Sequence, residues 1–147
     1  VTTKRLQKEL AIANTHFNQM FQVSLSEDDI SQWLVTFTMP AETIYAGETF
    51  QLKITFPYTY PTEAPEVVFT GTPPRHKHVY TNGFICLSTL YDGWTPVLKV
   101  SSVMLSIISM LSSAKKKTLP KNNKWLTKQF RGVSPKLVEW EFEDDAC

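Results

Sequence analysis

Cys86 is the residue whose type and setting best fit covalent chemistry. It follows the turn-forming pair Asn82-Gly83, comes eight and ten residues after His78 and His76, and precedes Trp94-Thr95-Pro96. A cysteine reacts as its thiolate, and a thiol with a pKa of about 8.5 needs only modest activation at neutral pH. These neighbours fit a carrier nucleophile, although composition alone favours a buried, inert cysteine.

The spacing of potential metal ligands and the net charge argue against metal binding and nucleic-acid binding. His76 and His78 are not expected to bind a metal, because no third or fourth ligand recurs near them. The formal net charge is only +1, which argues against general nucleic-acid affinity. That charge is unevenly distributed, since residues 114–138 are basic and residues 139–147 are mainly acidic and aromatic. An ordinary solvated surface is the simplest interpretation of both segments.

Two helices are predicted to hold this stretch in place. Apolar residues at helical spacing predict an amphipathic helix over about residues 3–14, with charged residues including Glu9 on its other side. A second, more apolar helix is predicted from residue 100 to the basic cluster at 115–117, whose charge suits a helix C-terminus.

Four short segments between these helices alternate apolar and polar residues, and their short connections predict an antiparallel meander. They lie at residues 21–25, 33–38, 50–56 and 67–70. A long irregular stretch around Cys86 extends to about residue 99, and one or two helical turns are expected at 125–130. The predicted fold class is α+β in a single domain.

Composition favours an intracellular globular protein. Hydrophobic residues make up 42% of the 147 residues, and no apolar run approaches the roughly 18 residues of a membrane span. The first residues are too polar for a secretory signal, and two cysteines are too few for the disulfide framework of a small secreted protein. We therefore expect a cytoplasmic or nuclear protein that binds neither membrane nor nucleic acid.

The motifs around Cys86 resemble those of the ubiquitin-conjugating enzymes over roughly residues 3–114. In that family a His-Pro-Asn triplet precedes Ile-Cys-Leu, and here His76-Lys77-His78 precedes Ile85-Cys86-Leu87 at the matching distance. Phe56-Pro57-x-x-Tyr60-Pro61 and Trp94-x-Pro96 resemble two further family motifs. The resemblance implies a fold with an N-terminal helix, a four-stranded antiparallel meander, a long active-site loop, a central helix and an irregular C-terminus. Residues 1–119 would form the catalytic core and residues 120–147 an atypical C-terminal segment of the same domain.

The activity implied by this resemblance is acyl transfer. Cys86 would take ubiquitin as a thioester from an activating enzyme, which uses the ATP, and pass it to a substrate amine together with RING or U-box ligases. The chain itself would need no cofactor. It is most similar to the W-type branch, which has histidine at the position of His78 and an aromatic, acidic end like residues 140–147. That branch implies transfer to the α-amino group of a substrate with a flexible N-terminus.

Roles for individual residues also follow from the resemblance. His78 would donate an N–H to the loop or to the developing oxyanion. His76, also assigned to the catalytic site, matches the structural histidine of the family. Lys77 departs from the family pattern, because it replaces the proline that stiffens the triplet.

The resemblance further assigns two partner surfaces. Arg5 and Lys8 resemble the basic face that contacts the activating enzyme. Thr62, Pro96 and Val97 fall in the two loops that contact ligases, although Thr62 replaces a phenylalanine that anchors a ligase in many members.

An acidic residue is missing from the segment that follows the second helix. Lysine-directed members of the family carry an Asp there, whereas residues 114–120 of this chain contain no carboxylate. A lysine amine with a pKa of about 10.4 is about 0.04% uncharged at pH 7, compared with about 14% for an α-amine with a pKa of about 7.8. A site without the acid would therefore penalise lysine more than an α-amine.

The aromatic and acidic composition of the chain's end is compatible either with a substrate-binding role or with a disordered end. Trp140, Asp144 and Asp145 are predicted to fold back near Cys86 and to hold the backbone and the ammonium group of a substrate. A lysine-directed enzyme, a carrier for another ubiquitin-like modifier and a non-catalytic ubiquitin-binding relative remain the alternatives.

Overall fold

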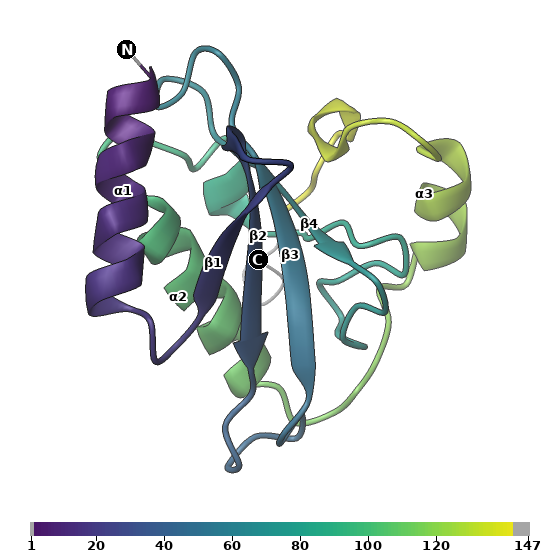
Figure 1. Ribbon diagram of the computed structural model, residues 1–147. Coiled ribbons are helices and arrows are strands. Elements are labelled where there is room, and N and C mark those ends of the chain that lie inside the picture. The colour runs from purple at the N-terminus through teal and green to yellow at the C-terminus, as the bar shows by residue number, and fades with distance from the viewer. Residues whose placement is uncertain (1, 143–147) are drawn as a thin grey trace.

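A four-stranded antiparallel sheet lies at the centre of the computed structural model, which describes residues 2–142 (Figure 1). The strands follow one another in space as they do in sequence, so the predicted meander is confirmed. Their bounds are β1 (Gln22–Ser26), β2 (Asp29–Thr38), β3 (Thr49–Thr55) and β4 (Glu66–Thr70).

The second strand begins earlier than the sequence pattern indicated. Ser26 pairs with Asp29, so Glu27 and Asp28 alone form the connection, with φ angles of 54° and 57°. Two consecutive positive φ angles are typical of a tight hairpin turn that usually contains Asn or Gly. Because neither residue occurs here, no sequence signal indicated so short a turn.

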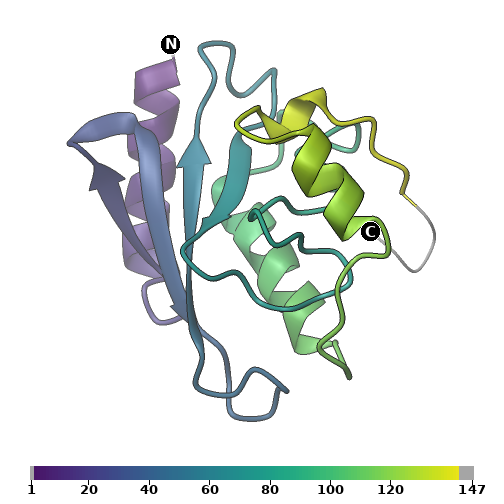
Figure 2. The ribbon, with the colours of Figure 1, turned by 90° about the vertical axis from the view of Figure 1, so that its right-hand side faces the viewer.

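Two helices pack against the sheet. Figure 1 shows α1 (Thr2–His16) beside the β1 end and α2 (Val100–Ser112) behind the strands, and the side view of Figure 2 agrees. The inward side chains of β2, β3 and β4 and the apolar stripe of α2 form one hydrophobic core. Its largest fully buried members include Trp33, Phe37, Leu52, Ile54, Met104 and Ile107.

Glu9 corrects the expected amphipathic pattern of the first helix. Its side chain is not on the solvated side, because Glu9 is only 4% exposed and lies between α1, α2 and the loop before β4. The carboxylate accepts hydrogen bonds from the Arg5 guanidinium (2.7 Å), the Tyr60 hydroxyl (2.6 Å) and the Val100 backbone N–H (2.8 Å). A buried carboxylate is tolerated where such partners replace water.

The chain beyond α2 adds two short helices outside the sheet. α3 (Asn123–Gln129) matches the helical turns predicted at 125–130, and the 3-10 helix η2 covers Pro135–Leu137. Figure 2 shows α3 over the irregular stretch that follows β4, in which the 3-10 helix η1 (Ser88–Leu90) is the one short helix between residues 71 and 99. Within residues 2–142 no helix is long and apolar enough to cross a membrane.

Candidate active site

A glycine holds the Cys86 loop against the sheet. Gly83 has a φ of +93°, and a Cβ atom placed on it would lie 2.3 Å from the backbone oxygen of Phe69 in β4. This close approach allows the Phe69 N–H to donate to the Gly83 carbonyl at 2.9 Å. The Asn82 side chain accepts a hydrogen bond from the Phe84 N–H and closes the turn. The Asn82-Gly83 pair therefore attaches the loop to β4 three residues before the cysteine.

The histidine triplet positions the backbone of Cys86. The Cys86 N–H donates to the His78 carbonyl at 2.8 Å, and the His78 N–H donates to Nδ1 of His76 at 3.0 Å. His76 and His78 are both buried, with ring centroids 5.3 Å apart. The structure therefore brings together the three residues that the sequence assigned to the catalytic site.

His76 lies between the loop and α2. Burial, together with the neighbouring His78 and Lys77, lowers the pKa of His76 to about 4, although a hydrogen bond with the backbone of Met110 opposes this shift. His76 is therefore uncharged at neutral pH and contributes no positive charge that would stabilise a thiolate. Its contacts fit the structural role that the resemblance implied.

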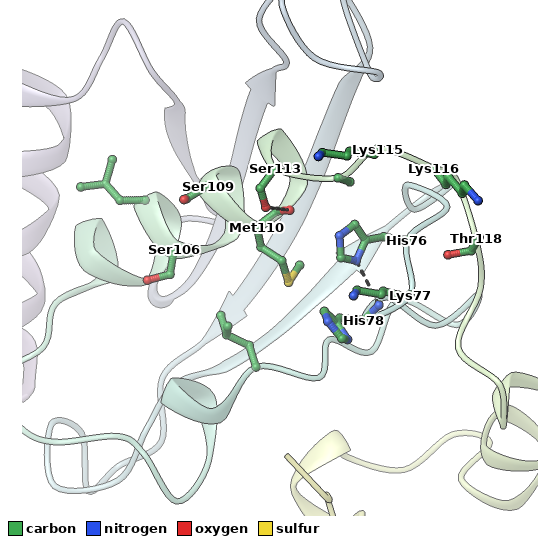
Figure 3. A pocket seen from close by; sticks show the side chains of 13 residues that line it. His76, Lys77, His78, Ser106, Ser109, Met110, Ser113, Lys115, Lys116 and Thr118 are labelled. Atoms are coloured by element: carbon green, nitrogen blue, oxygen red, sulfur yellow. Dashed lines mark hydrogen bonds between the residues drawn. The ribbon is translucent and has the colours of Figure 1, made fainter. Parts of the chain in front are cut away.

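Figure 3 shows the triplet across a cavity from Met110 and Ser113 of α2 and its C-terminal end, with Lys115 and Lys116 on the segment that follows. This cavity has a volume of about 890 Å³, and no acidic residue of the described chain lines it. Residues 114–120 thus bring lysines to this side of the triplet, in agreement with the missing acid.

A second cavity of about 960 Å³, here called the Cys86 cleft, contains the cysteine itself. Cys86 is 8% exposed and belongs to a small apolar cluster with Tyr80, Phe84 and Leu126 of α3. The Tyr80 hydroxyl donates to the Asn122 side chain at 2.7 Å, and this bond attaches the start of α3 to the loop. The C-terminal part of the chain is therefore a wall of the cleft.

Trp140 lies where the sequence analysis expected it, next to the Cys86 cluster. Its ring stacks on Tyr91 at a centroid distance of 5.1 Å and meets Tyr80 edge-on at 5.7 Å. Its indole N–H donates to the Pro135 carbonyl at 2.9 Å. The predicted substrate-binding residues Asp144 and Asp145 lie outside the described residues.

Two carboxylates that the sequence analysis did not assign line the Cys86 cleft. Glu139 and Glu141 flank Trp140 in the chain and share the cleft with Lys77 and Lys121. The sequence contained a usable signal, because both glutamates alternate with apolar residues from position 138 to 142. That period of two indicates an extended segment with one packed side.

The predicted partner residues occupy two different settings. Lys8 is exposed, whereas the Arg5 guanidinium donates to the Pro96 and Leu98 carbonyls at 3.0 and 2.9 Å. Arg5 therefore joins the first helix to the loop before α2. In the expected ligase-contacting loops, Thr62 and Pro96 are exposed and Val97 is 82% exposed.

Comparisons with known proteins agree with this geometry. The family model for "Ubiquitin-conjugating enzyme" matches residues 5–133. The "Probable ubiquitin-conjugating enzyme E2 W" of Dictyostelium discoideum is 46% identical over 143 residues, 97% of this chain and 95% of that protein. The "Probable ubiquitin-conjugating enzyme E2 W-A" of Danio rerio is 46% identical over 147 residues, 98% of this chain and 97% of that protein.

Solved structures give the same result. The crystal structure of ubiquitin-conjugating enzyme E2 UbcA1 from Agrocybe aegerita has a TM-score of 0.84 and 35% sequence identity, and it covers 92% of this chain and 99% of its own. The sheet and helices therefore form the fold of these enzymes, as the sequence predicted. By its motifs, its fold and its relatives, the chain belongs to the ubiquitin-conjugating enzyme family.

Proposed function

We propose that Cys86 accepts ubiquitin as a thioester and that the chain then transfers it to the N-terminal α-amino group of a substrate. The observation that carries the first half is the position of Cys86 in the cleft, with its backbone N–H held by the His78 carbonyl, in a chain of this family. Members of the family work with ubiquitin, an activating enzyme and ligases, so the donor and the partners follow from membership.

Two acyl transfers make up the reaction. The Cys86 thiolate attacks the thioester carbonyl of ubiquitin on the activating enzyme, and the thiolate of that enzyme leaves. An uncharged amine nitrogen then attacks the new thioester, the C–S bond breaks, its electron pair returns to Cys86 as a thiolate, and the nitrogen loses a proton to water. His78, buried beside Cys86 and lining the same cleft, supports the loop or the oxyanion that forms during these attacks.

The α-amine is favoured by two observations. The chain resembles W-type relatives over nearly its whole length, and residues 114–120 bring no carboxylate to the triplet. Under these conditions the amine that is already uncharged has the advantage, since an α-amine is about 14% uncharged at pH 7 and a lysine about 0.04%. Substrates with flexible N-termini are the proposed class, because the α-amine must enter the cleft to meet Cys86.

The first test is thioester formation. Reduced protein incubated with activating enzyme, ATP and ubiquitin should form an adduct that thiols cleave, and Cys86→Ser should form an oxygen-linked conjugate that thiols leave intact. Turnover of Cys86→Ser at the wild-type rate would mean that another residue is the nucleophile. Repeating the reaction with other ubiquitin-like modifiers identifies the one that is carried.

The second test locates the modified nitrogen. A flexible peptide with one lysine is offered with its N-terminus either unmodified or acetylated, and mass spectrometry locates the linkage. Modification of the α-amine, lost on acetylation, is the expected result. Modification of the lysine in both peptides would favour a lysine-directed enzyme, an alternative that the carboxylates of Glu139 and Glu141 in the cleft support.

A further inference from the structure

The segment that follows η2 has two different sides. Residues 138–142, here called the strap, alternate between half-buried and exposed positions. Val138, Trp140 and Phe142 pack against the cluster that contains Cys86. Glu139 and Glu141 are exposed, and both line the Cys86 cleft. The apolar side of the strap therefore attaches it to the body of the protein, and its other side brings two carboxylates to the cleft.

Several contacts fix the position of the strap. Trp140 and Phe142 both stack on Tyr91, with centroid distances of 5.1 and 6.1 Å. Just before the strap, Ser134 donates to Glu66 at 2.7 Å, and Lys136 forms an ion pair with Glu63 at 2.6 Å. The strap is thus attached to β4 and its preceding loop at one end and to Tyr91 along its length.

The two carboxylates are available for an outside partner. Neither takes part in the three ion pairs formed within residues 2–142, which use Glu9, Glu48 and Glu63. Opposite charges in a cleft attract an incoming ion, and the protonated amine of a substrate is the cation that this reaction must bring to the cysteine.

We propose that Glu139 and Glu141 bind the protonated amine of the substrate as it enters the Cys86 cleft, and that one of them receives the proton that this ammonium group must lose before its nitrogen can attack. This inference rests on the proposed function and adds two residues to it. In the balanced step, the bound ammonium group first gives one proton to a carboxylate oxygen, which passes it to water. The uncharged nitrogen then forms a bond to the thioester carbon, Cys86 leaves as a thiolate, and the nitrogen loses its second proton to water. The strap thereby supplies the acid that residues 114–120 lack.

The experiment compares Glu139→Gln/Glu141→Gln with a matched control, Glu27→Gln/Glu42→Gln, which removes the same charge from two exposed residues that do not line the cleft. Each protein is loaded with ubiquitin, and single-turnover transfer to a lysine-free peptide with an unmodified N-terminus is followed from pH 6.5 to pH 9. Hydroxylamine, a nucleophile that is uncharged at pH 7 and above, is used in parallel.

Both double variants should form the thioester normally. Only Glu139→Gln/Glu141→Gln should change, and only in its transfer of ubiquitin to the peptide. At pH 6.5–7 the strap variant should need about tenfold more peptide for half-maximal rate, in line with the loss of one or two exposed charge pairs. The gap should close near pH 9, because an α-amine with a pKa of about 7.8 is then uncharged. Transfer to hydroxylamine should be equal in all three proteins.

Two outcomes overturn the inference alone: no gap at any pH, or a gap of the same size at every pH and with hydroxylamine, which would indicate a structural role. Failure of the wild-type chain to form a thioester would overturn the proposed function itself. Because loading is measured before transfer, the two failures are distinguishable.

Discussion

The carboxylate of Glu9 accepts a hydrogen bond from the backbone N–H of Val100, a residue 91 positions later, at 2.8 Å. Val100 is the first residue of α2, so Glu9 satisfies one of the unpaired N–H groups at that helix end. Its negative charge also interacts favourably with the helix dipole. One side chain of α1 thus sets where the central helix begins, at the end of the loop that carries Cys86.

Replacing Glu9 should strongly destabilise the fold. Glu9→Ala leaves Arg5, Tyr60 and the Val100 N–H without their shared acceptor, and we expect a loss of about 3 kcal/mol in the free energy of unfolding. Urea denaturation measures this loss. Gln7→Ala, on the exposed side of the same helix, should change it by less than about 0.5 kcal/mol. A cost below about 1 kcal/mol for Glu9→Ala would contradict the structural role of this network.

Adding one methyl group at Gly83 should disrupt the Cys86 loop. The new Cβ would collide with the Phe69 carbonyl, and the φ of +93° is unfavourable for any other residue. We expect Gly83→Ala to cost at least about 3 kcal/mol and to abolish thioester formation.

Gly71→Ala is the matched control, because Gly71 also has a positive φ of +68° but open space around it. It should cost only about 1 kcal/mol and leave thioester formation intact. Equal costs at the two positions would show that the contact with β4 does not restrict the loop.

His76 should make the protein less stable as the pH falls. Its pKa is about 4 in the folded state, against about 6.5 when the chain is unfolded, so the unfolded chain takes up this proton first. The free energy of unfolding should therefore become smaller as the pH is lowered from 6.5 to 4. For one proton the loss is at most about 1.36 kcal/mol per pH unit. His76→Gln should lack this component, and parallel curves for the two proteins would refute the assignment.

Removing the Trp140 ring should release the strap. Trp140→Ala loses the stacking on Tyr91 and the contact with Tyr80, and we expect a stability cost of about 2 kcal/mol. Transfer to a peptide α-amine should slow while thioester formation is retained. Trp140→Phe keeps an aromatic ring but loses the N–H donated to Pro135, and it should keep most of the transfer rate. Unchanged transfer in Trp140→Ala would show that the strap takes no part in it.

The apolar pattern and the motif spacing predicted the helices, the meander and the long loop, because burial periodicity is local in sequence. They also predicted that the residues now found together, Cys86, His76 and His78, belong to one site. The contacts of polar residues whose partners lie far away in the sequence could not be predicted from local patterns. Glu9 was expected on the solvated side of its helix, since no local pattern reveals that Tyr60 and Val100 meet it.

The cleft wall was missed for a related reason. The segment after the central helix contains no acid, and the predicted acids near Cys86 were Asp144 and Asp145, beyond Trp140. Glu139 and Glu141 line the cleft although they lie about 20 residues after the segment 114–120. The chain reaches the cleft through α3, and Trp140 holds it there by stacking on Tyr91.

Because the strap alternates between packed and exposed residues, its function depends on the spacing between η2 and Trp140. Inserting or deleting one residue between η2 and Trp140 would exchange its two sides, because successive side chains of an extended chain point in opposite directions. The glutamates would then face the aromatic cluster and the tryptophan would face water, although composition and net charge would hardly change. An insertion of two residues would restore the order of the sides and shift it along the chain.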